Sequence, residues 1–261
     1  MKKTLIDNLP FELPYEIDRL VRGAHIFDSS CSPEAKVYFI DRDGGYYLKR
    51  ARGGSLLREK EMTEYFHKKG LGANILAYHT GEHDIMLSEA VRGQDCTHQM
   101  YLSDHKRLCD TISQRLRMLH ELDFSDCPRQ NKMTEYLSTA EGNYYKGNYD
   151  KSHFPDSFGY KSAEDAWSVL QNGKNLLKSD VLLHGDYCLP NIMLDNWSFS
   201  GFVDLDSAGI GDRHIDIFWG IWTLWFNLGT YDFSSRFLDG YGRDKINIDA
   251  IKTIAAAEVF G

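Results

Sequence analysis

Hydrophobic positions near the start of the chain gather in two short runs, separated by polar and glycine residues, which is typical of paired strands. Residues 35–41 and 45–50 are rich in β-branched and aromatic side chains, and an Asp-Gly-Gly turn lies between them within residues 41–45. Strand-forming runs joined by such a turn predict a β-hairpin.

A helix and further strands are expected directly after this hairpin. Residues 55–69 carry Leu56, Met62 and Phe66 along one side, which is typical of a helix. Two short apolar runs follow at 75–78 and 85–87. The beginning of the chain therefore predicts a small antiparallel sheet with one helix.

The second part of the chain is predicted to be mainly helical. Leu108, Ile112, Leu116 and Leu119 recur at intervals of four, four and three residues. Ser162 and Asp165 have the spacing of a capping box that opens another helix. Further helices are expected over 213–227 and 245–259, and short strands over 181–183, 192–194 and 201–203.

A short polar segment at 88–93 separates these two parts. We therefore expect an α+β fold with two lobes, one of residues 1–90 and one of residues 91–261.

Composition narrows the classes of protein that this chain can belong to. Of its 261 residues, 42% are hydrophobic and 26% are charged, which fits a globular protein, and the net charge is −8. An acid excess disfavours nucleic-acid binding, which needs a basic face. The same excess fits a cationic ligand or simply solubility.

Cysteines and apolar segments indicate the compartment. Five widely spaced cysteines without a Cys-X-X-Cys pair fit neither a disulfide framework nor a zinc site. The most apolar stretch, 217–226, is far shorter than a membrane span. We expect a cytoplasmic protein without a membrane segment.

The segment 184–216 carries the side chains with the clearest chemistry. Asp186 follows an apolar run, Asn191 comes five residues later, and Asp204 ends another strand-like run. A strand–loop–strand hairpin can bring these side chains together. One carboxylate can then accept a hydroxyl proton while an amide oxygen and a second carboxylate hold Mg²⁺, as phosphoryl transfer requires. Each residue alone is more often a turn or cap residue, but the joint spacing favours the site.

A lysine in the first lobe complements these residues. Lys49 lies in a strand-like run, and Glu59 follows ten residues later in the expected helix. A strand lysine held by a helix glutamate can bind nucleotide phosphates. No Gly-X-Gly-X-X-Gly loop precedes Lys49, and the segment 28–33 stands in its place.

These motifs resemble the aminoglycoside 3′-phosphotransferase family, a branch of the protein-kinase-like fold. The similarity spans nearly the whole chain and includes SPEAKVY, YLK, REKEM, LSEA, DFSDCP, HGDYCLPNIM and GFVDLDSAGIGDRHID. It implies a bilobal kinase-like fold, with a nucleotide-binding lobe at 1–90 and a catalytic, acceptor-binding lobe at 91–261.

The resemblance also implies a role for particular residues. Asp186 would be the catalytic base, Asn191 and Asp204 the Mg²⁺ ligands, and Lys49 the phosphate-binding lysine with Glu59 as its partner. Tyr47 would stack on adenine, Ser88 and Ala90 would supply hinge hydrogen bonds, and Ser32 would contact phosphate.

This chain departs from the family pattern at three places. Asp206 and Ser207 stand where relatives have Gly-Arg, so a cation is replaced by a carboxylate. Ala257 replaces one member of an acidic pair, which leaves Glu258. The helix after Asp216 carries aromatic residues where relatives have charged ones. This aromatic cluster is interpreted first as a core helix, and otherwise as the wall of a flatter, less cationic acceptor pocket.

We therefore expect ATP-dependent (or GTP-dependent) and Mg²⁺-dependent phosphorylation of an aminoglycoside at its 3′-hydroxyl, conferring antibiotic resistance. The acceptor would be a small polycationic molecule, bound by Glu258 and, more weakly supported, by Asp156 and Asp150. The chain would be a monomer or weak dimer.

The alternatives are a kinase for a macrolide, sugar or choline-like metabolite, or a nucleotide-binding pseudoenzyme. A protein kinase is disfavoured because the His-Arg-Asp, Asp-Phe-Gly and Ala-Pro-Glu motifs are absent from the sequence.

Overall fold

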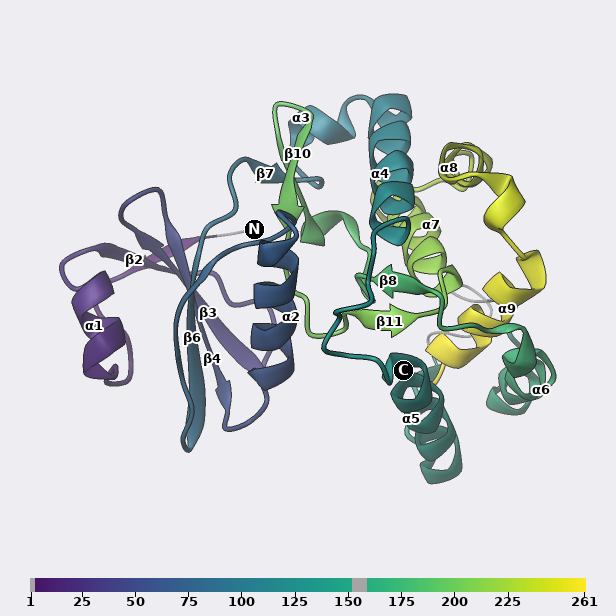
Figure 1. The fold of residues 1–261 in the computed structure, drawn as a ribbon, viewed down its shortest axis with the longest axis horizontal. Coiled ribbons are helices and arrows are strands. Elements are labelled where there is room, and N and C mark those ends of the chain that lie inside the picture. Colours follow the sequence, from purple (N-terminus) through teal and green to yellow (C-terminus); the bar gives the residue numbers. More distant parts are fainter. Residues whose placement is uncertain (1–2, 152–158) are drawn as a thin grey trace. The chain divides into compact units, whose positions relative to one another are not determined.

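The computed structural model describes residues 3–151 and 159–261 (Figure 1). The chain divides into two compact units. The first comprises Met1–Gly93 and Met193–Asp206, and the second comprises Gln94–Ile192 and Ser207–Gly261. The first unit thus also includes residues 193–206. The predicted division into 1–90 and 91–261 places these residues in the second lobe.

A six-stranded antiparallel sheet forms the centre of the first unit, in the order β1-β2-β3-β4-β6-β5. The β3–β4 pair is the predicted hairpin, in which Val37 lies opposite Lys49. Asp43, Gly44 and Gly45 in its turn have positive φ angles, which glycine adopts without a steric penalty. The strands are β1 (Thr4–Ile6), β2 (His25–Asp28), β3 (Ala35–Asp41), β4 (Tyr46–Arg52), β5 (Ile75–His79) and β6 (His83–Glu89).

Two helices, α1 (Tyr15–Val21) and α2 (Leu57–Lys68), pack against this sheet. Ile17 of α1 belongs to the same buried cluster as Leu48 of β4. Leu56, which precedes α2, clusters with Ala51 of β4 instead. Because successive strand side chains point to opposite faces, the two helices lie on different faces of the sheet. The prediction of one helix missed α1, whose seven residues are too few to show a clear period.

The later segment of the first unit is a β-hairpin. Its strands are β9 (Ile192–Asp195) and β10 (Ser198–Phe202). The Phe202 N–H donates to the Leu71 carbonyl at 2.7 Å, which ties β10 to the chain just after α2. This tie places Asp204 within the same unit as Lys49.

The second unit is mainly helical, as predicted. Asp104 caps α4 by accepting from the Arg107 N–H at 3.1 Å, and the Ser162 hydroxyl caps α6 by accepting from the Asp165 N–H at 3.2 Å. The helices are α3 (Gln99–Leu102), α4 (His105–His120), α5 (Lys132–Lys146), α6 (Ala163–Gly173), α7 (His214–Leu228), α8 (Ser234–Tyr241) and α9 (Ile248–Glu258), with 3-10 turns η2 (Lys174–Leu176), η3 (Leu189–Asn191) and η4 (Arg243–Lys245).

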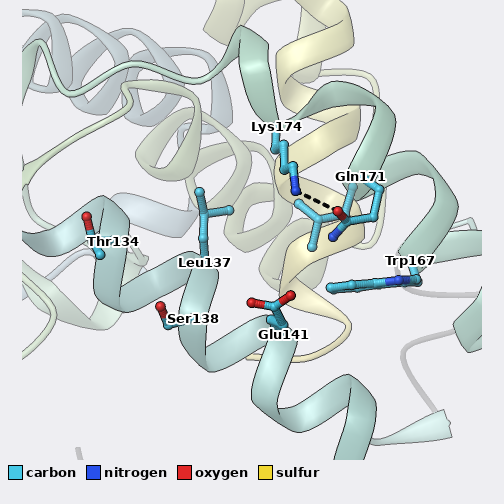
Figure 2. A pocket seen from close by; sticks show the side chains of 8 residues that line it. Thr134, Leu137, Ser138, Glu141, Trp167, Gln171 and Lys174 are labelled. Atoms are coloured by element: carbon cyan, nitrogen blue, oxygen red, sulfur yellow. Dashed lines mark hydrogen bonds between the residues drawn. The ribbon is translucent and has the colours of Figure 1, made fainter.

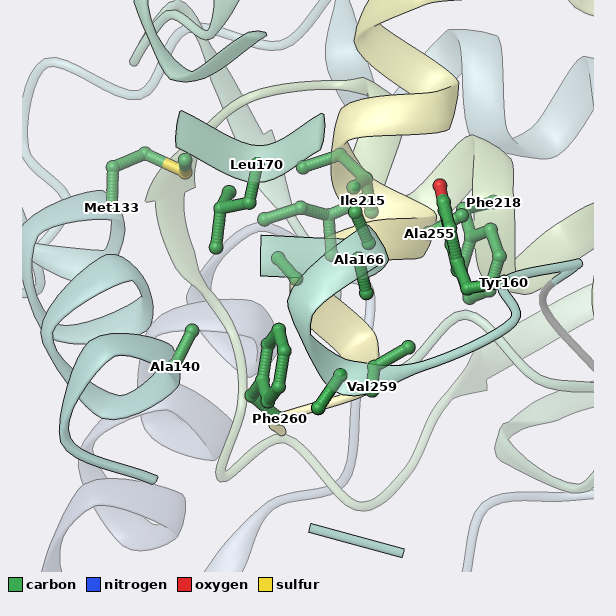
Figure 3. Close-up of a cluster of buried hydrophobic side chains, with 14 of the residues drawn as sticks. Met133, Ala140, Tyr160, Ala166, Leu170, Ile215, Phe218, Ala255, Val259 and Phe260 are labelled. Carbon is green, nitrogen blue, oxygen red and sulfur yellow. The ribbon is translucent and has the colours of Figure 1, made fainter. Parts of the chain in front are cut away.

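Two strands and one large apolar cluster organise these helices. β8 (Val181–Leu183) pairs antiparallel with β11 (Gly209–Gly211), and the short β7 (Gln94–Asp95) lies at the start of the unit. Figure 3 shows side chains of α6, α7 and the C-terminal residues packed together, among them Leu170, Ile215 and Phe260. This core fixes the ends of β8 and α7, between which Asp186, Asn191 and Asp204 lie in the sequence.

Candidate functional site

Lys49 is the centre of an ion-pair group in the first unit. Its Nζ lies 2.6 Å from a Glu59 carboxylate oxygen and 3.2 Å from an Asp204 oxygen. Burial alone lowers the pKa of Lys49, but the charges of Glu59 and Asp204 outweigh it and hold the pKa above its ordinary value. Lys49 is therefore a fixed positive charge, and the contact with Glu59 is the one that the sequence spacing predicted.

Asp204 has an unusual backbone conformation. Its φ angle is +60°, in the left-handed region that non-glycine residues rarely adopt. Such conformations concentrate at functional sites, where the surrounding structure holds them. The Asp204 side chain is 54% exposed, so its carboxylate remains open to a ligand.

Tyr47 lies on the same face of β4 as Lys49, two residues before it. Its ring centroid lies 5.3 Å from that of Phe39. Ser88 of β6 lies opposite Tyr47 in the sheet. Tyr47 and Ser88 are thus neighbours, as a shared role in base binding would need.

The structure gives less support to the nucleotide contacts predicted for Ala90 and Ser32. The Ala90 N–H donates to the Gly45 carbonyl at 2.9 Å, so a hydrogen bond from this N–H to a nucleotide would first require that bond to open. Ser32 is exposed in the loop between β2 and β3. Their predicted contacts with nucleotide stay predictions.

Asp186 and Asn191 form a second group, in the second unit. Asp186 follows β8, and Asn191 ends the turn η3. The Asn191 side-chain N–H donates to the Asp186 carboxylate at 2.8 Å and to its carbonyl at 3.1 Å. The amide oxygen of Asn191 is consequently the atom left for another ligand.

A buried carboxylate outside the predicted site residues holds this loop. Asp216, at 0% exposure, accepts hydrogen bonds from the N–H groups of His184 and Gly185, both at 2.8 Å, and from His120 at 3.1 Å. Gly185 has φ +85°, and a Cβ there would lie 2.0 Å from the Ser207 carbonyl oxygen. Asp216 and Gly185 thus set the path of the chain into Asp186. An acidic residue inside an apolar run was the available signal for Asp216.

Glu258, the predicted acceptor ligand, is buried at the end of α9. One of its oxygens accepts from the Tyr136 hydroxyl at 2.8 Å and from the Trp219 indole N–H at 3.2 Å. Burial raises the pKa of Glu258 to about 7, although these hydrogen bonds and Lys132 oppose the rise. The charge of Asp186 adds to the rise.

The other two acceptor candidates receive less support. Asp150 is exposed after α5. Asp156 lies outside the described residues.

The structure brings together Lys49, Glu59 and Asp204 in one unit and Asp186 and Asn191 in the other. The convergence of Asp204 with Asp186 and Asn191 stays a prediction.

A pocket of about 250 Å³ lies between α5 and α6 (Figure 2). Leu137 and Trp167 give it apolar walls, and Lys174 donates to Gln171 at 2.6 Å on its rim. None of the predicted site residues lines this pocket. We assign the pocket no part in the reaction.

The described residues include no helix that is long and apolar enough to cross a membrane. All five cysteines are free.

Residues 27–252 match the family model described as "Phosphotransferase enzyme family". A protein of Lactococcus lactis subsp. lactis (strain IL1403), named "Probable aminoglycoside 3'-phosphotransferase", is 47% identical over 251 residues, which cover 96% of this chain and 95% of the relative.

Solved structures share the fold at low identity. An aminoglycoside-3'-phosphotransferase of type VIII has a TM-score of 0.76 at 21% identity, covering 94% of this chain and 98% of its own. An aminoglycoside phosphotransferase from Streptomyces rimosus, in complex with ADP and streptomycin, has a TM-score of 0.71 at 20% identity, covering 86% and 90%. The bilobal kinase-like α+β fold expected from the sequence is thereby confirmed.

Proposed function

Because the chain belongs to the phosphotransferase enzyme family, in the branch of the aminoglycoside 3′-phosphotransferases, we propose that it transfers the γ-phosphate of ATP to the 3′-hydroxyl of an aminoglycoside and so confers resistance. The observation that carries the acceptor class is the 47% identity, over nearly the full length, to a probable aminoglycoside 3'-phosphotransferase.

Lys49 is proposed to bind the nucleotide phosphates. Glu59 and Asp204 keep it charged and restrict its position, at 2.6 and 3.2 Å. A positioned cation stabilises the negative charge that develops during phosphoryl transfer without rearranging during the reaction. Tyr47 supplies an aromatic face for adenine, with Ser88 beside it.

Asp186 is proposed to orient the acceptor hydroxyl and accept its proton. As the new bond from oxygen to γ-phosphorus forms, the bond from γ-phosphorus to the bridging oxygen breaks and ADP leaves. The Asn191 amide and the Asp216-anchored loop hold the Asp186 carboxylate in one orientation. Most of the rate gain then comes from positioning.

The Asp204 carboxylate and the Asn191 amide oxygen are proposed to hold Mg²⁺. Both are hard oxygen donors, which this ion prefers, and the Asp204 side chain is more than half exposed. The bound ion would neutralise charge on the phosphates.

Glu258 is proposed to receive an ammonium group of a polycationic acceptor. Among the described residues, Glu258 is the one predicted acceptor carboxylate that is both buried and held by hydrogen bonds. Asp150 and Asp156 stay weaker candidates. A cytoplasmic location, a monomeric or weakly dimeric state, and the choice of ATP over GTP stay predictions.

A kinase for another hydroxylated small molecule is the second candidate. The exposed Phe226 on α7, at 65% exposure, and the partly buried tryptophans beside it favour this candidate because they suit a less charged acceptor.

Purified protein with Mg²⁺ and ATP or GTP, offered aminoglycosides and then macrolides, sugars and choline, tests these candidates by ADP or GDP release. Expression in a susceptible bacterium should raise aminoglycoside inhibitory concentrations. Turnover of none of the aminoglycosides would reject the main proposal.

Asp186→Asn tests the residue assignment. It should lower kcat by about 10²–10⁴-fold and leave nucleotide binding near wild type. Asp249→Asn, at an exposed residue of α9, is the matched control and should keep full turnover. Full turnover by Asp186→Asn would remove Asp186 from the mechanism.

A further inference from the structure

Three aromatic rings lie side by side across β2, β3 and β4, on the face of the sheet that carries Lys49. Phe27 lies opposite Phe39, and Phe39 lies opposite Tyr47. Directly opposed residues of antiparallel strands point to the same face. The ring centroids of Phe27 and Phe39 are 6.2 Å apart, and those of Phe39 and Tyr47 are 5.3 Å apart. We call these three rings the base platform, because Tyr47 is the residue proposed to stack on adenine.

The base platform borders the segment that is predicted to contact the edge of the base. Ser88 lies opposite Tyr47 in the sheet. A Cβ placed on Gly45 would lie 2.6 Å from the Phe39 ring and 3.2 Å from the Cβ of Ala90, so this ring and Ala90 are close neighbours. A purine stacked on Tyr47 with its edge toward Ala90 would therefore pass beside the Phe39 ring.

The ammonium group of Lys3 lies on this platform. Its Nζ is 3.1 Å from the ring centroid of Phe39 and 5.6 Å from that of Tyr47, and both distances are within the range of a cation–π interaction. Much of Lys3 is exposed, yet burial lowers its pKa, against the charge of Asp41. The ammonium group thus lies against the rings instead of extending into solvent.

The pairing of β1 directs Lys3 to the platform. Leu5 of β1 lies opposite Phe27, and Lys3 comes two residues before Leu5, so its side chain points to the same face. β1 is an edge strand of three residues that is hydrogen-bonded to β2. Short elements at an edge open at a lower free energy than the core of a protein. Lys3 can consequently leave the rings without unfolding of the sheet.

We propose that Lys3 is an internal competitor of the nucleotide base: its ammonium group occupies the aromatic surface that a purine needs, so ATP must displace Lys3 in order to bind. The inference rests on the proposed function, since it takes Tyr47 as the residue that stacks on the base. A purine and an ammonium group both bind to the face of an aromatic ring, and the two cannot occupy the same face together. The strand at the beginning of the chain therefore weakens nucleotide binding.

Lys3→Ala removes the competitor. Isothermal titration calorimetry of the full chain with Mg²⁺ compares ATP with inorganic tripolyphosphate, which has the phosphates without the base. The variant should bind ATP about 2–5-fold more tightly than wild type, with no gain in affinity for tripolyphosphate. Lys69→Ala is the matched control, because the Lys69 Nζ also lies over a ring of the first unit, 5.3 Å from the centroid of Tyr65, but not over the base platform. This control should leave the affinity for ATP unchanged.

Failure of this inference and failure of the proposed function give different results. A wild-type protein that does not bind ATP would overturn the proposed function. If the wild type binds ATP and Lys3→Ala binds it equally or more weakly, the competition is overturned and the proposed function stands. An equal gain for ATP and tripolyphosphate would also overturn the competition, because the effect would then not involve the base.

Discussion

Arg58 forms an ion pair with Asp206, with 3.3 Å between guanidinium nitrogen and carboxylate oxygen. Asp206 is the residue that replaces glycine in the Gly-Arg pair of the resembling family. Burial raises the pKa of Glu59. The charges of Asp204 and Asp206 raise this pKa further, whereas the charge of Lys49 lowers it. Arg58 therefore supplies a cation where the chain has gained an acid.

Arg58→Ala should weaken ATP binding, because Asp206 then loses its ion pair with Arg58 and repels the phosphates more strongly. We expect the KM for ATP to rise about 3–5-fold, for a loss near 1 kcal/mol, and stability to change by less than about 1 kcal/mol because the pair is exposed.

The double variant Arg58→Ala/Asp206→Ala should recover most of the ATP affinity. Lys60→Ala, on the same helix and paired with Glu64 instead, is the control and should have no effect. Additive losses in the double variant would contradict the compensation.

Lys49→Met should impair both catalysis and folding, because it leaves the Glu59 carboxylate buried without its cation. We expect stability at pH 8 to fall by about 1–3 kcal/mol. Lys49→Met/Glu59→Gln should restore stability but not activity. Urea denaturation and kcat/KM for ATP measure the two effects. Equal stability of the single and double variants would show that Glu59 does not depend on Lys49.

Asp216→Asn should loosen the loop that carries Asp186. An amide oxygen cannot accept all the bonds that two backbone N–H groups and His120 now donate, and its NH₂ group would face a donor. We expect a stability loss of about 2–4 kcal/mol and a lower kcat with little change in the KM for ATP. The surface variant Asp249→Asn provides the baseline, and a stable variant with normal kcat would exclude the anchoring role.

Glu258 should make acceptor use depend on pH. Its pKa of about 7 in the folded protein exceeds the ordinary value of 4.5. The folded state consequently holds this proton more tightly than the unfolded state. Stability from this group is greatest below pH 4.5 and is lost as pH rises toward about 7. Binding of an ammonium group needs the ionised form, so acceptor kcat/KM should rise through the same range.

Glu258→Gln should flatten both profiles. Relative to wild type, its stability should be similar near pH 5 and higher by about 2–3 kcal/mol at pH 8, while acceptor kcat/KM falls at pH 8. Denaturation curves and initial rates from pH 5 to 9 measure this. A variant that keeps the wild-type pH dependence would assign the titration to another group.

The sequence by itself determined the elements whose residues are close along the chain. The β3–β4 hairpin, the α4 helix and the Ser162 cap all depend on local turn chemistry, periodicity or spacing, and the structure reproduces them. The Lys49–Glu59 contact was predictable for the same reason, since a strand followed by a helix limits where ten residues can lead. The short α1 left too weak a pattern to find.

Tertiary structure alone decided the contacts between distant residues. Asp216 meets His120 from 96 positions away, Arg58 meets Asp206 from 148 away, and Glu258 becomes buried beneath Tyr136 and Trp219. The hydrophobic periodicity of a helix predicts which of its faces is buried, but it does not predict which side chains of another helix that face contacts. Burial then changes what each side chain can do: it raises the pKa of Glu258 and makes Asp216 an anchor. The exposed end of α7 likewise offers Phe226 as a surface, which its apolar sequence alone would have assigned to a core.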